Sequence, residues 1–279
     1  MEQRCLLAAF AHPDDEAFGT AGVFRKYRDE GATTALVCAT RGEEGHISDP
    51  TLATAQTLGQ VREQELREAC RIIGIEDLSF LDYHDGSLAQ ADPIEATGRL
   101  GRQIRRVRPQ VVVTFDANGG YGHRDHMAIH RLTVAAFQQA GDPTCYPEQL
   151  AEGLRPYAPQ KLYFTAFARS VMRTMREALR EAGAADFRPG GNAATIPLEE
   201  MGTPDALITT TITLDERQLD AKLRAMRAHR TQMNPRNPIN LLSPEAIRAW
   251  LGTERFVRAS PPAGSRDADE HDLFAGVRL

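Results

Sequence analysis

Short apolar runs alternate with segments of helical periodicity along the first half of the chain. The runs at residues 5–10, 33–39, 78–81 and 111–115 predict buried strands. Between them, apolar positions at helical spacing predict helices over about 17–30, up to Gly74, over 93–108 and over 125–140. Strands and helices that alternate in this way predict right-handed crossovers. We therefore expect an α/β fold: a Rossmann-like, mostly parallel sheet with helices on both faces.

The second half of the chain has a less regular pattern. We expect strands at 161–168 and 206–214, helices at 171–182 and 215–228, and loops rich in Pro and Gly at 143–159 and 189–204. The predicted organisation is one α/β domain over residues 1–279. Residues 1–140 would form its Rossmann-like core, residues 141–258 would complete it with irregular additions, and residues 259–279 would form a partly mobile tail.

Composition narrows the class of partner. The chain has 42% hydrophobic residues and a formal net charge of -5, so we expect neither a nucleic-acid surface nor a membrane partner. The apolar run that begins at Cys5 is too short for the core of a signal peptide, which predicts a cytoplasmic protein. The four cysteines are scattered and lack the paired spacing of a structural zinc site.

The first cluster of polar residues lies directly after the first predicted strand, at His12, Asp14, Asp15 and Glu16. Ligands of open parallel sheets bind beyond the carboxyl ends of the strands. The acids alone could be explained as the N-cap and first turn of a helix. That alternative leaves His12 unexplained.

A second cluster follows the fourth predicted strand and contains His123, Asp125 and His126. On a helix from about residue 125, His126 shares the sheet-facing side with Ile129 and His130, and we interpret His130 as a core histidine. Two imidazoles and one carboxylate, from His12, Asp15 and His126, form a three-ligand site with open positions. Such a set is typical of catalytic zinc and also of non-haem iron.

The remaining polar residues of these clusters suggest catalytic roles. Asp14 could accept a proton from a metal-activated water. His123 could face the substrate carbonyl oxygen as an imidazolium, held charged by Asp125. On the long helix that ends near Gly74, Arg62 and Glu65 fall in the middle of the apolar face. They could form an internal salt bridge or reach the rim of the site.

Taken together, these motifs resemble the PIG-L/LmbE family of zinc-dependent N-acetylglucosaminyl deacetylases, of the mycothiol- and bacillithiol-pathway type. The matching stretches span almost the whole chain in family order. They are residues 11–16, 40–45, 62–66, 122–126, Lys222 with 229–232, and 272–274. The stretches at 11–16 and 122–126 are the specific ones.

The resemblance implies a metal held by His12, Asp15 and His126, with Asp14 as general base. It implies that His123 stabilises the oxyanion and that Asp125 orients it. Substrate contacts are expected from a further set: Arg62, Glu43, Arg124 and His229. Arg124 is included as a substitute, because Gly122 occupies the position where bacillithiol-pathway enzymes commonly carry an arginine.

The implied reaction is hydrolysis of the acetamide of an N-acetylglucosamine conjugate to acetate and a free amine, in low-molecular-weight thiol biosynthesis. The cofactor would be Zn²⁺, with Fe²⁺ as the alternative, and the partner a small amino-sugar substrate. The sequence leaves open a homo-oligomer and the group linked to the glucosamine. Alternatives are an amidase acting on another sugar or thiol conjugate and an Fe(II) oxygenase with the same ligands. A nucleotide-binding module is disfavoured, since residues 12–18 contain no glycine.

Overall fold

The centre of the molecule is a seven-stranded sheet with strand order β3-β2-β1-β4-β5-β7-β6. The computed structural model describes residues 3–197, 199–233, 237–261 and 269–279. The strands are β1 (Cys5–Phe10), β2 (Thr33–Cys38), β3 (Asp77–Phe80), β4 (Val111–Thr114), β5 (Lys161–Ala166), β6 (Thr210–Thr213) and β7 (Thr253–Ser260). From β3 to β5 the strands in this order run parallel, whereas β7 is antiparallel to both of its neighbours.

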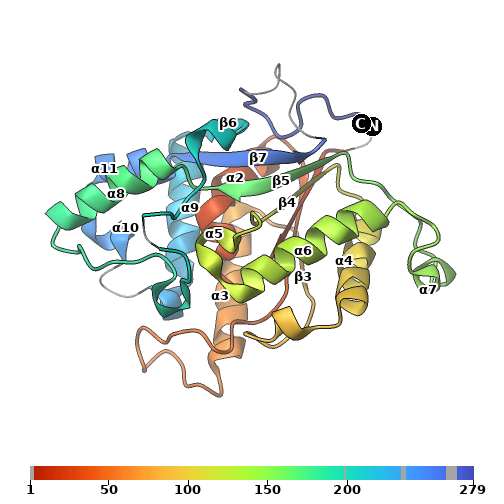
Figure 1. Ribbon diagram of the computed structural model, residues 1–279, viewed down its shortest axis with the longest axis horizontal. Coiled ribbons are helices and arrows are strands. Elements are labelled where there is room, and N and C mark those ends of the chain that lie inside the picture. The colour runs from red at the N-terminus through yellow and green to blue at the C-terminus, as the bar shows by residue number, and fades with distance from the viewer. Residues whose placement is uncertain (1–2, 198, 234–236, 262–268) are drawn as a thin grey trace.

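Helices cover both faces of the sheet (Figure 1). The longer helices are α2 (Ala21–Asp29), α3 (Leu58–Ile73), α4 (Pro93–Val107), α6 (Arg124–Gln139), α8 (Arg169–Glu181), α9 (Glu216–Ala228) and α11 (Pro244–Leu251). Short helices are α1 (Asp15–Gly19), α5 (Gly119–Gly122), α7 (Pro147–Ala151) and α10 (Pro238–Leu241). Short 3₁₀ turns are η1 (Leu88–Gln90), η2 (Gly191–Ala193), η3 (Asp205–Leu207) and η4 (Arg230–Gln232). Helices α4 and α6 pack together on one face, and α2, α3 and α9 pack together on the other.

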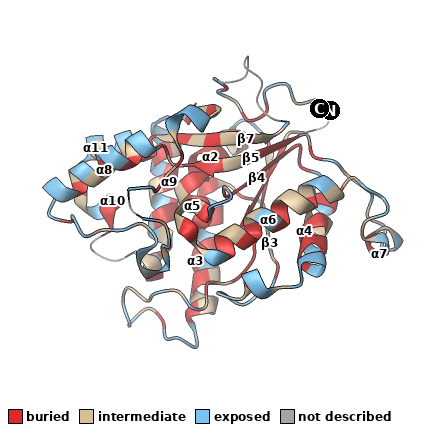
Figure 2. Cartoon of the chain, viewed as in Figure 1, coloured by how far each residue is buried: buried red, intermediate tan, exposed pale blue. Residues whose placement is uncertain are grey.

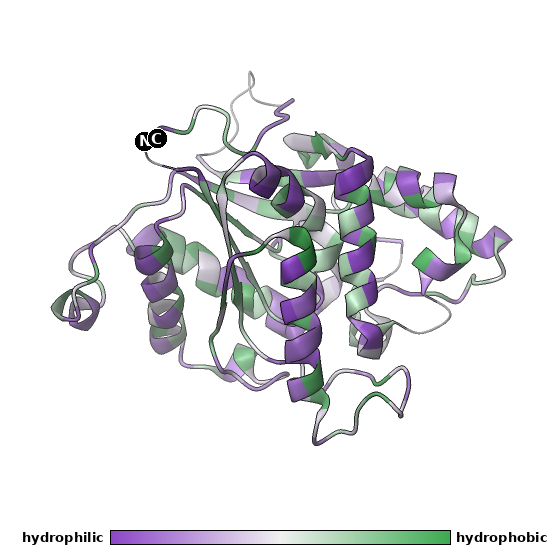
Figure 3. Cartoon of the chain, turned by 180° about the vertical axis from the view of Figure 1, so that it is seen from behind, coloured by the Kyte–Doolittle hydropathy of each residue, from purple (hydrophilic) through white to green (hydrophobic). Residues whose placement is uncertain are grey.

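Burial follows the layers. The inner strands β1 and β4 are buried along their whole length, as expected for parallel strands covered on both faces. Figure 2 shows the buried strands in the middle and exposed outer sides on α4 and α8. Figure 3 shows the opposite face, where the outer sides of the helices are largely hydrophilic. The predicted α/β class is therefore confirmed.

Local sequence explains where several helices begin and end. Asp92 caps α4 by accepting the backbone N–H groups of Ile94 and Glu95, and Pro93 occupies its first turn. Helix α3 ends where Gly74 adopts a left-handed φ of 84° and its N–H bonds to the carbonyl of Cys70. These signals place both helices close to the predicted ranges.

The single helix predicted over 17–30 is wrong in one respect, because the chain breaks at Thr20 into α1 and α2. The cause is a residue far along the sequence. The buried carboxylate of Glu254 in β7 accepts the N–H groups of Gly22 and Val23 at 2.9 and 2.7 Å. It thereby caps a new helix start and also pairs with Lys222 at 2.8 Å.

The described part of the tail packs against the sheet. Leu273 is fully buried, and the hydroxyl of Tyr27 accepts its N–H at 2.7 Å while donating to Asp272 at 2.8 Å. Glu270 lies among Lys161, Tyr163 and Arg258 on the strands. Residues 262–268 of the predicted mobile tail lie outside the described residues. Among the described residues, no helix is long and apolar enough to cross a bilayer.

Candidate functional site

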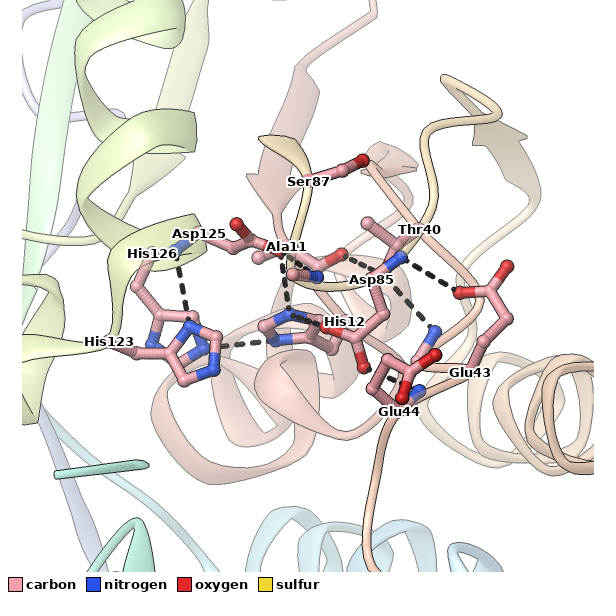
Figure 4. Close-up of polar contacts among 12 residues, drawn as sticks. Ala11, His12, Thr40, Glu43, Glu44, Asp85, Ser87, His123, Asp125 and His126 are labelled. Carbon is pink, nitrogen blue, oxygen red and sulfur yellow. Dashed lines mark hydrogen bonds and ion pairs between the residues drawn. The ribbon is translucent and has the colours of Figure 1, made fainter. Parts of the chain in front are cut away.

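The three predicted metal ligands meet at the carboxyl ends of β1 and β4. Nδ1 of His12 lies 3.1 Å from Nε2 of His126, which lies 3.3 Å from a carboxylate oxygen of Asp15. Nδ1 of His12 lies 3.7 Å from the other carboxylate oxygen of Asp15. Figure 4 shows the rings of His12, His123 and His126 turned toward one another.

This spacing fits a metal. Ligand atoms about 2.0–2.1 Å from a tetrahedral zinc are separated from one another by roughly 3.3 Å. The separations of Nε2 of His126 from Nδ1 of His12 and from Oδ1 of Asp15, 3.1 and 3.3 Å, are close to that value. The 3.7 Å from Nδ1 of His12 is measured to the other oxygen, Oδ2. Asp15 is fixed by the N–H groups of Ala11 and His12, and Nδ1 of His126 lies 3.1 Å from the carbonyl of Gly119. Within the described residues, two trios have ligand atoms that all lie within 4.8 Å of one another: His12–His123–His126 and His12–Asp85–Asp125. Both contain His12, one contains His126, and neither contains Asp15.

The pKa values of the three residues are displaced by burial and by their neighbours. Burial opposes protonation of His12, but the carboxylates of Asp125, Asp85 and Asp15 outweigh it and raise the pKa of His12 to about 10. Burial raises the pKa of Asp15 to about 7 although His12 opposes this rise. Burial, His12 and His123 lower the pKa of His126, so its ring is neutral and can act as a ligand. A divalent cation would replace the proton on His12.

Asp14 is held beside the ligands in an uncommon conformation. Its φ of 107° lies in the left-handed region, which non-glycine residues rarely adopt. One carboxylate oxygen lies 3.3 Å from the guanidinium of Arg62. Burial raises the pKa of Asp14, and Arg62 opposes this rise. Its side chain remains 23% exposed, so it can reach a water in the site.

His123 differs from the expectation of a charged imidazolium. Burial and His12 lower its pKa, and they outweigh the opposing effect of Asp125. Nδ1 of His123 accepts the backbone N–H of Asp125 at 3.2 Å, which leaves the proton of the neutral ring on Nε2. The ring can therefore donate a hydrogen bond without a positive charge.

The carboxylate of Asp125 faces His12 and the loop after β3. It accepts the N–H of Gly86 at 2.7 Å and lies 3.6 Å from Nε2 of His12. Its link to His123 is the backbone N–H described above. In this structure Asp125 therefore contacts His123 through its backbone N–H, whereas its carboxylate faces other groups.

Asp85 was not predicted from the sequence. Its carboxylate lies 3.0 Å from Nε2 of His12, and although burial opposes ionisation, His12 and Arg62 hold its pKa down at about 2. A carboxylate behind a ligating imidazole fixes the ring and its tautomer. The available signal was its place after the strand at 78–81, the same position that drew attention to His12. Glu43, a predicted substrate contact, is half-buried and accepts the N–H of Asp85 at 3.1 Å.

Arg62 is 3% exposed, and its guanidinium donates to the carbonyls of Gly42 and Pro13 as well as approaching Asp14. Of the two alternatives for Arg62 and Glu65, the internal salt bridge is replaced by other partners, since Glu65 accepts from the N–H and hydroxyl of Thr231 at 2.8 and 2.6 Å. The predicted face of α3 is nevertheless correct, because both side chains are buried.

The other two predicted substrate contacts behave differently. Arg124 is exposed at the start of α6, next to His123. His229 is 2% exposed, and its Nε2 lies 2.7 Å from Glu16. Although burial opposes the charged form, Glu16 raises the pKa of His229. Thus His229 lies beneath the site surface.

The fold and the candidate site define an α/β protein with a cluster of histidines and carboxylates at the carboxyl ends of its parallel strands. Comparison with known proteins identifies the family. The family model described as PIG-L, GlcNAc-PI de-N-acetylase, matches residues 7–137. The chain is 38% identical to 1D-myo-inositol 2-acetamido-2-deoxy-alpha-D-glucopyranoside deacetylase of Thermobispora bispora, over 99% of this chain and 100% of the relative. The chain belongs to the PIG-L family.

Solved structures share the fold. N,N'-diacetylchitobiose deacetylase from Pyrococcus horikoshii superposes with a TM-score of 0.66 at 19% identity, covering 99% of this chain and 87% of that one. GalB, the 4-carboxy-2-hydroxymuconate hydratase of Pseudomonas putida, superposes with a TM-score of 0.59 at 17% identity, covering 94% and 97%. Because a hydratase shares it, this fold alone does not decide between amide hydrolysis and hydration.

Proposed function

We propose that the protein is a metal-dependent deacetylase that hydrolyses the acetamide of an N-acetylglucosamine conjugate, with 1D-myo-inositol 2-acetamido-2-deoxy-α-D-glucopyranoside as the substrate. The observation that carries the proposal is that Nδ1 of His12 and a carboxylate oxygen of Asp15 lie 3.1 and 3.3 Å from Nε2 of His126, with a spare carboxylate, Asp14, beside them. The full-length similarity to deacetylases of that substrate supports the choice of sugar. Amine release would place the enzyme in low-molecular-weight thiol biosynthesis.

His12, Asp15 and His126 would hold the metal, and we propose zinc because two imidazoles and a carboxylate suit it. When bound, the metal would act as a Lewis acid toward the acetamide oxygen and lower the pKa of a water. Asp14 is the general base that accepts the proton of the attacking water. Its neighbour Arg62 favours the ionised carboxylate that this role needs.

His123 is the proposed hydrogen-bond donor to the oxyanion. With Nδ1 occupied by the N–H of Asp125, its Nε2–H is directed away from the backbone and is available to the developing negative charge. The leaving amine must then receive a proton, which Asp14 holds after the first step. Glu43 and the exposed Arg124 remain proposed contacts of the sugar or its aglycone.

The experiment is a substrate comparison on metal-analysed protein. The inositol conjugate, a malate conjugate, free N-acetylglucosamine and N,N'-diacetylchitobiose are incubated with zinc-loaded enzyme, and both acetate and free amine are measured. We expect equal release of the two products and the highest kcat/KM with the inositol conjugate. A higher kcat/KM with another conjugate would make that conjugate the proposed substrate. If none of the four releases amine, the proposed function is wrong.

A second arm tests the Fe(II) oxygenase alternative, since the same three ligands suit iron. Hydrolysis needs no oxygen, so turnover by the zinc-loaded enzyme should be equal with and without air. A strict requirement for oxygen and Fe²⁺ would favour the oxygenase. All four cysteines are unpaired, which fits our proposal that the protein works in the reducing cytoplasm.

A further inference from the structure

The backbone of Asp14 needs an external restraint. Its φ of 107° and ψ of -25° are unfavourable for a residue with a side chain. Such conformations persist where the surroundings determine them, and they concentrate at functional sites. The groups that contact this residue therefore show what fixes the proposed base.

Glu16 supplies one restraint. It is fully buried, and its two carboxylate oxygens have separate partners. One oxygen accepts the backbone N–H of Asp14 at 3.0 Å. The other lies 2.7 Å from Nε2 of His229, which comes from the end of α9, 213 residues further along the chain. A carboxylate with both oxygens engaged cannot rotate without breaking one of these bonds.

We infer that His229 and Glu16 form a positioning pair that holds the backbone of Asp14 in its left-handed conformation and so aims its carboxylate into the site. This inference rests on the proposed function only in taking Asp14 as the base. It replaces the expected substrate contact of His229. A side chain that is 2% exposed and bonded to Glu16 has no surface to offer a sugar.

The alternative is that the pair only anchors the turn that follows α9. The chain provides a matched control for that alternative, because the same turn has a second buried anchor. Thr231 donates its N–H and hydroxyl to Glu65 on α3, at 2.8 and 2.6 Å. That anchor holds the turn without a bond to Asp14. Loss of either anchor should loosen the turn, but only loss of His229 should release Asp14.

The test compares variants in metal-loaded and metal-free protein. His229→Leu removes the bond to Glu16, and the shorter amide side chain of His229→Asn ends too far from the Glu16 carboxylate to form it. His229→Gln keeps an N–H donor near the position of Nε2. Thr231→Val is the control, with Glu65→Gln in reserve if that variant does not fold. Metal content, kcat, KM and melting temperature are measured, together with hydrogen exchange of the Asp14 amide in metal-free protein.

We expect His229→Leu and His229→Asn to lower kcat by about 10–100-fold, with KM nearly unchanged and one metal per chain retained. Exchange of the Asp14 amide should speed up in both, and His229→Gln should restore most of kcat and protection. Thr231→Val should lower the melting temperature while kcat and Asp14 exchange stay near wild type.

Normal kcat and exchange in His229→Leu and His229→Asn would overturn the inference. An equal loss of kcat and of Asp14 amide protection in Thr231→Val would also overturn it, because His229 would then act only as an anchor of the turn after α9. A rise in KM with unchanged kcat in the His229 variants would instead support the expectation that His229 contacts the substrate. If the wild type releases no amine from any conjugate, the proposed function fails, and the exchange comparison alone then decides whether the pair holds Asp14.

Discussion

Two buried clusters of charged residues lie in this sheet, and they differ in how their charges are balanced. At the carboxyl ends of β1 and β4, the ligand cluster of His12, Asp15 and His126 is crowded by further carboxylates, and its pKa values are strongly displaced. In the tail cluster, Glu270 contacts both Lys161 and Arg258 and accepts from the hydroxyl of Tyr163. The tail cluster pairs its carboxylate with the side chains of Lys161 and Arg258, whereas the carboxylates of the ligand cluster surround His12, whose positive charge depends on a bound proton.

The difference separates a binding site from a structural ion-pair cluster. Buried charges are tolerated when they are paired with opposite charges and hydrogen-bonded. A cluster whose charged groups are all paired within the protein has no free group with which to bind a ligand. Strongly displaced pKa values in a buried cluster are instead typical of functional sites. Four predictions test this contrast.

The largest effect is expected for His126→Ala. This substitution leaves only two of the three ligands, which should bind metal poorly. Metal content measured by mass spectrometry should fall from about one ion per chain to nearly none, and amine release should disappear with it. Retention of wild-type metal content in the purified variant would refute the ligand assignment.

Asp14→Asn should give the next largest effect and separate catalysis from binding. The variant lacks the proton acceptor but keeps all three ligands, so metal content should stay normal. Removal of a general base typically lowers kcat by about 10²–10⁴-fold. Loss of metal in Asp14→Asn would mean that the roles of the two adjacent carboxylates are reversed.

In the tail cluster, Glu270→Ala should affect stability and leave the chemistry alone. The change removes the buried carboxylate that contacts both Lys161 and Arg258, and we expect the free energy of unfolding to fall by about 3–5 kcal/mol. Denaturant unfolding measures the loss, and kcat per folded molecule should remain that of the wild type. The exposed pair of Arg25 and Asp29 serves as the control, because Asp29→Ala should cost less than about 1 kcal/mol. A small effect of Glu270→Ala would remove the contrast between the clusters.

The smallest effect is a pH dependence of metal binding. In metal-free protein the pKa of His12 is about 10, so its ring is protonated at pH 7, and ligation requires the neutral ring. Binding should therefore release about one proton, and affinity should rise by up to about tenfold per pH unit below pH 10. Asp15, with a pKa of about 7, should add to the release below that pH.

Calorimetry in buffers with different ionisation enthalpies measures the protons released. His130→Gln is the control, because His130 lies one turn beyond His126 and contacts the carbonyl of Phe115. It should show the same release as the wild type. Binding at pH 7 without proton release would contradict the protonated state of His12.

The strands that sequence predicts well are those with continuous apolar runs. Strand β1 occupies the predicted residues 5–10 because both of its faces are buried. Strand β7 was missed, since its inward positions include Glu254 and Arg258 beside Phe256. Charged residues on a buried face look like a surface strand or a loop until their partners are known. Those partners, Lys222 and Glu270, lie in other elements.

The candidate site was likewise only partly predictable from the sequence. The convergence of His12, Asp15 and His126 was predictable because their compact motifs follow the buried strands β1 and β4. The surroundings of Asp14 were not, since Glu16 looks like an ordinary residue of a first helical turn. Its bond to His229 joins residues 213 positions apart. The pair of Arg62 with Glu65 was a local hypothesis from helical spacing, and tertiary partners replaced it.

The separation of His229 from Glu16 also has a consequence for synthesis. Every proposed metal ligand precedes residue 127, and the strands β1 and β4, which the ligands follow in the sequence, pair with each other directly. A ribosome adding about 5–20 residues per second needs roughly 5–20 s to pass from His126 to His229. A nascent chain could therefore capture its metal during that interval, before the residue that fixes its base has been made. In that order of events, each molecule binds its metal before the contact between His229 and Glu16 that positions Asp14 has formed.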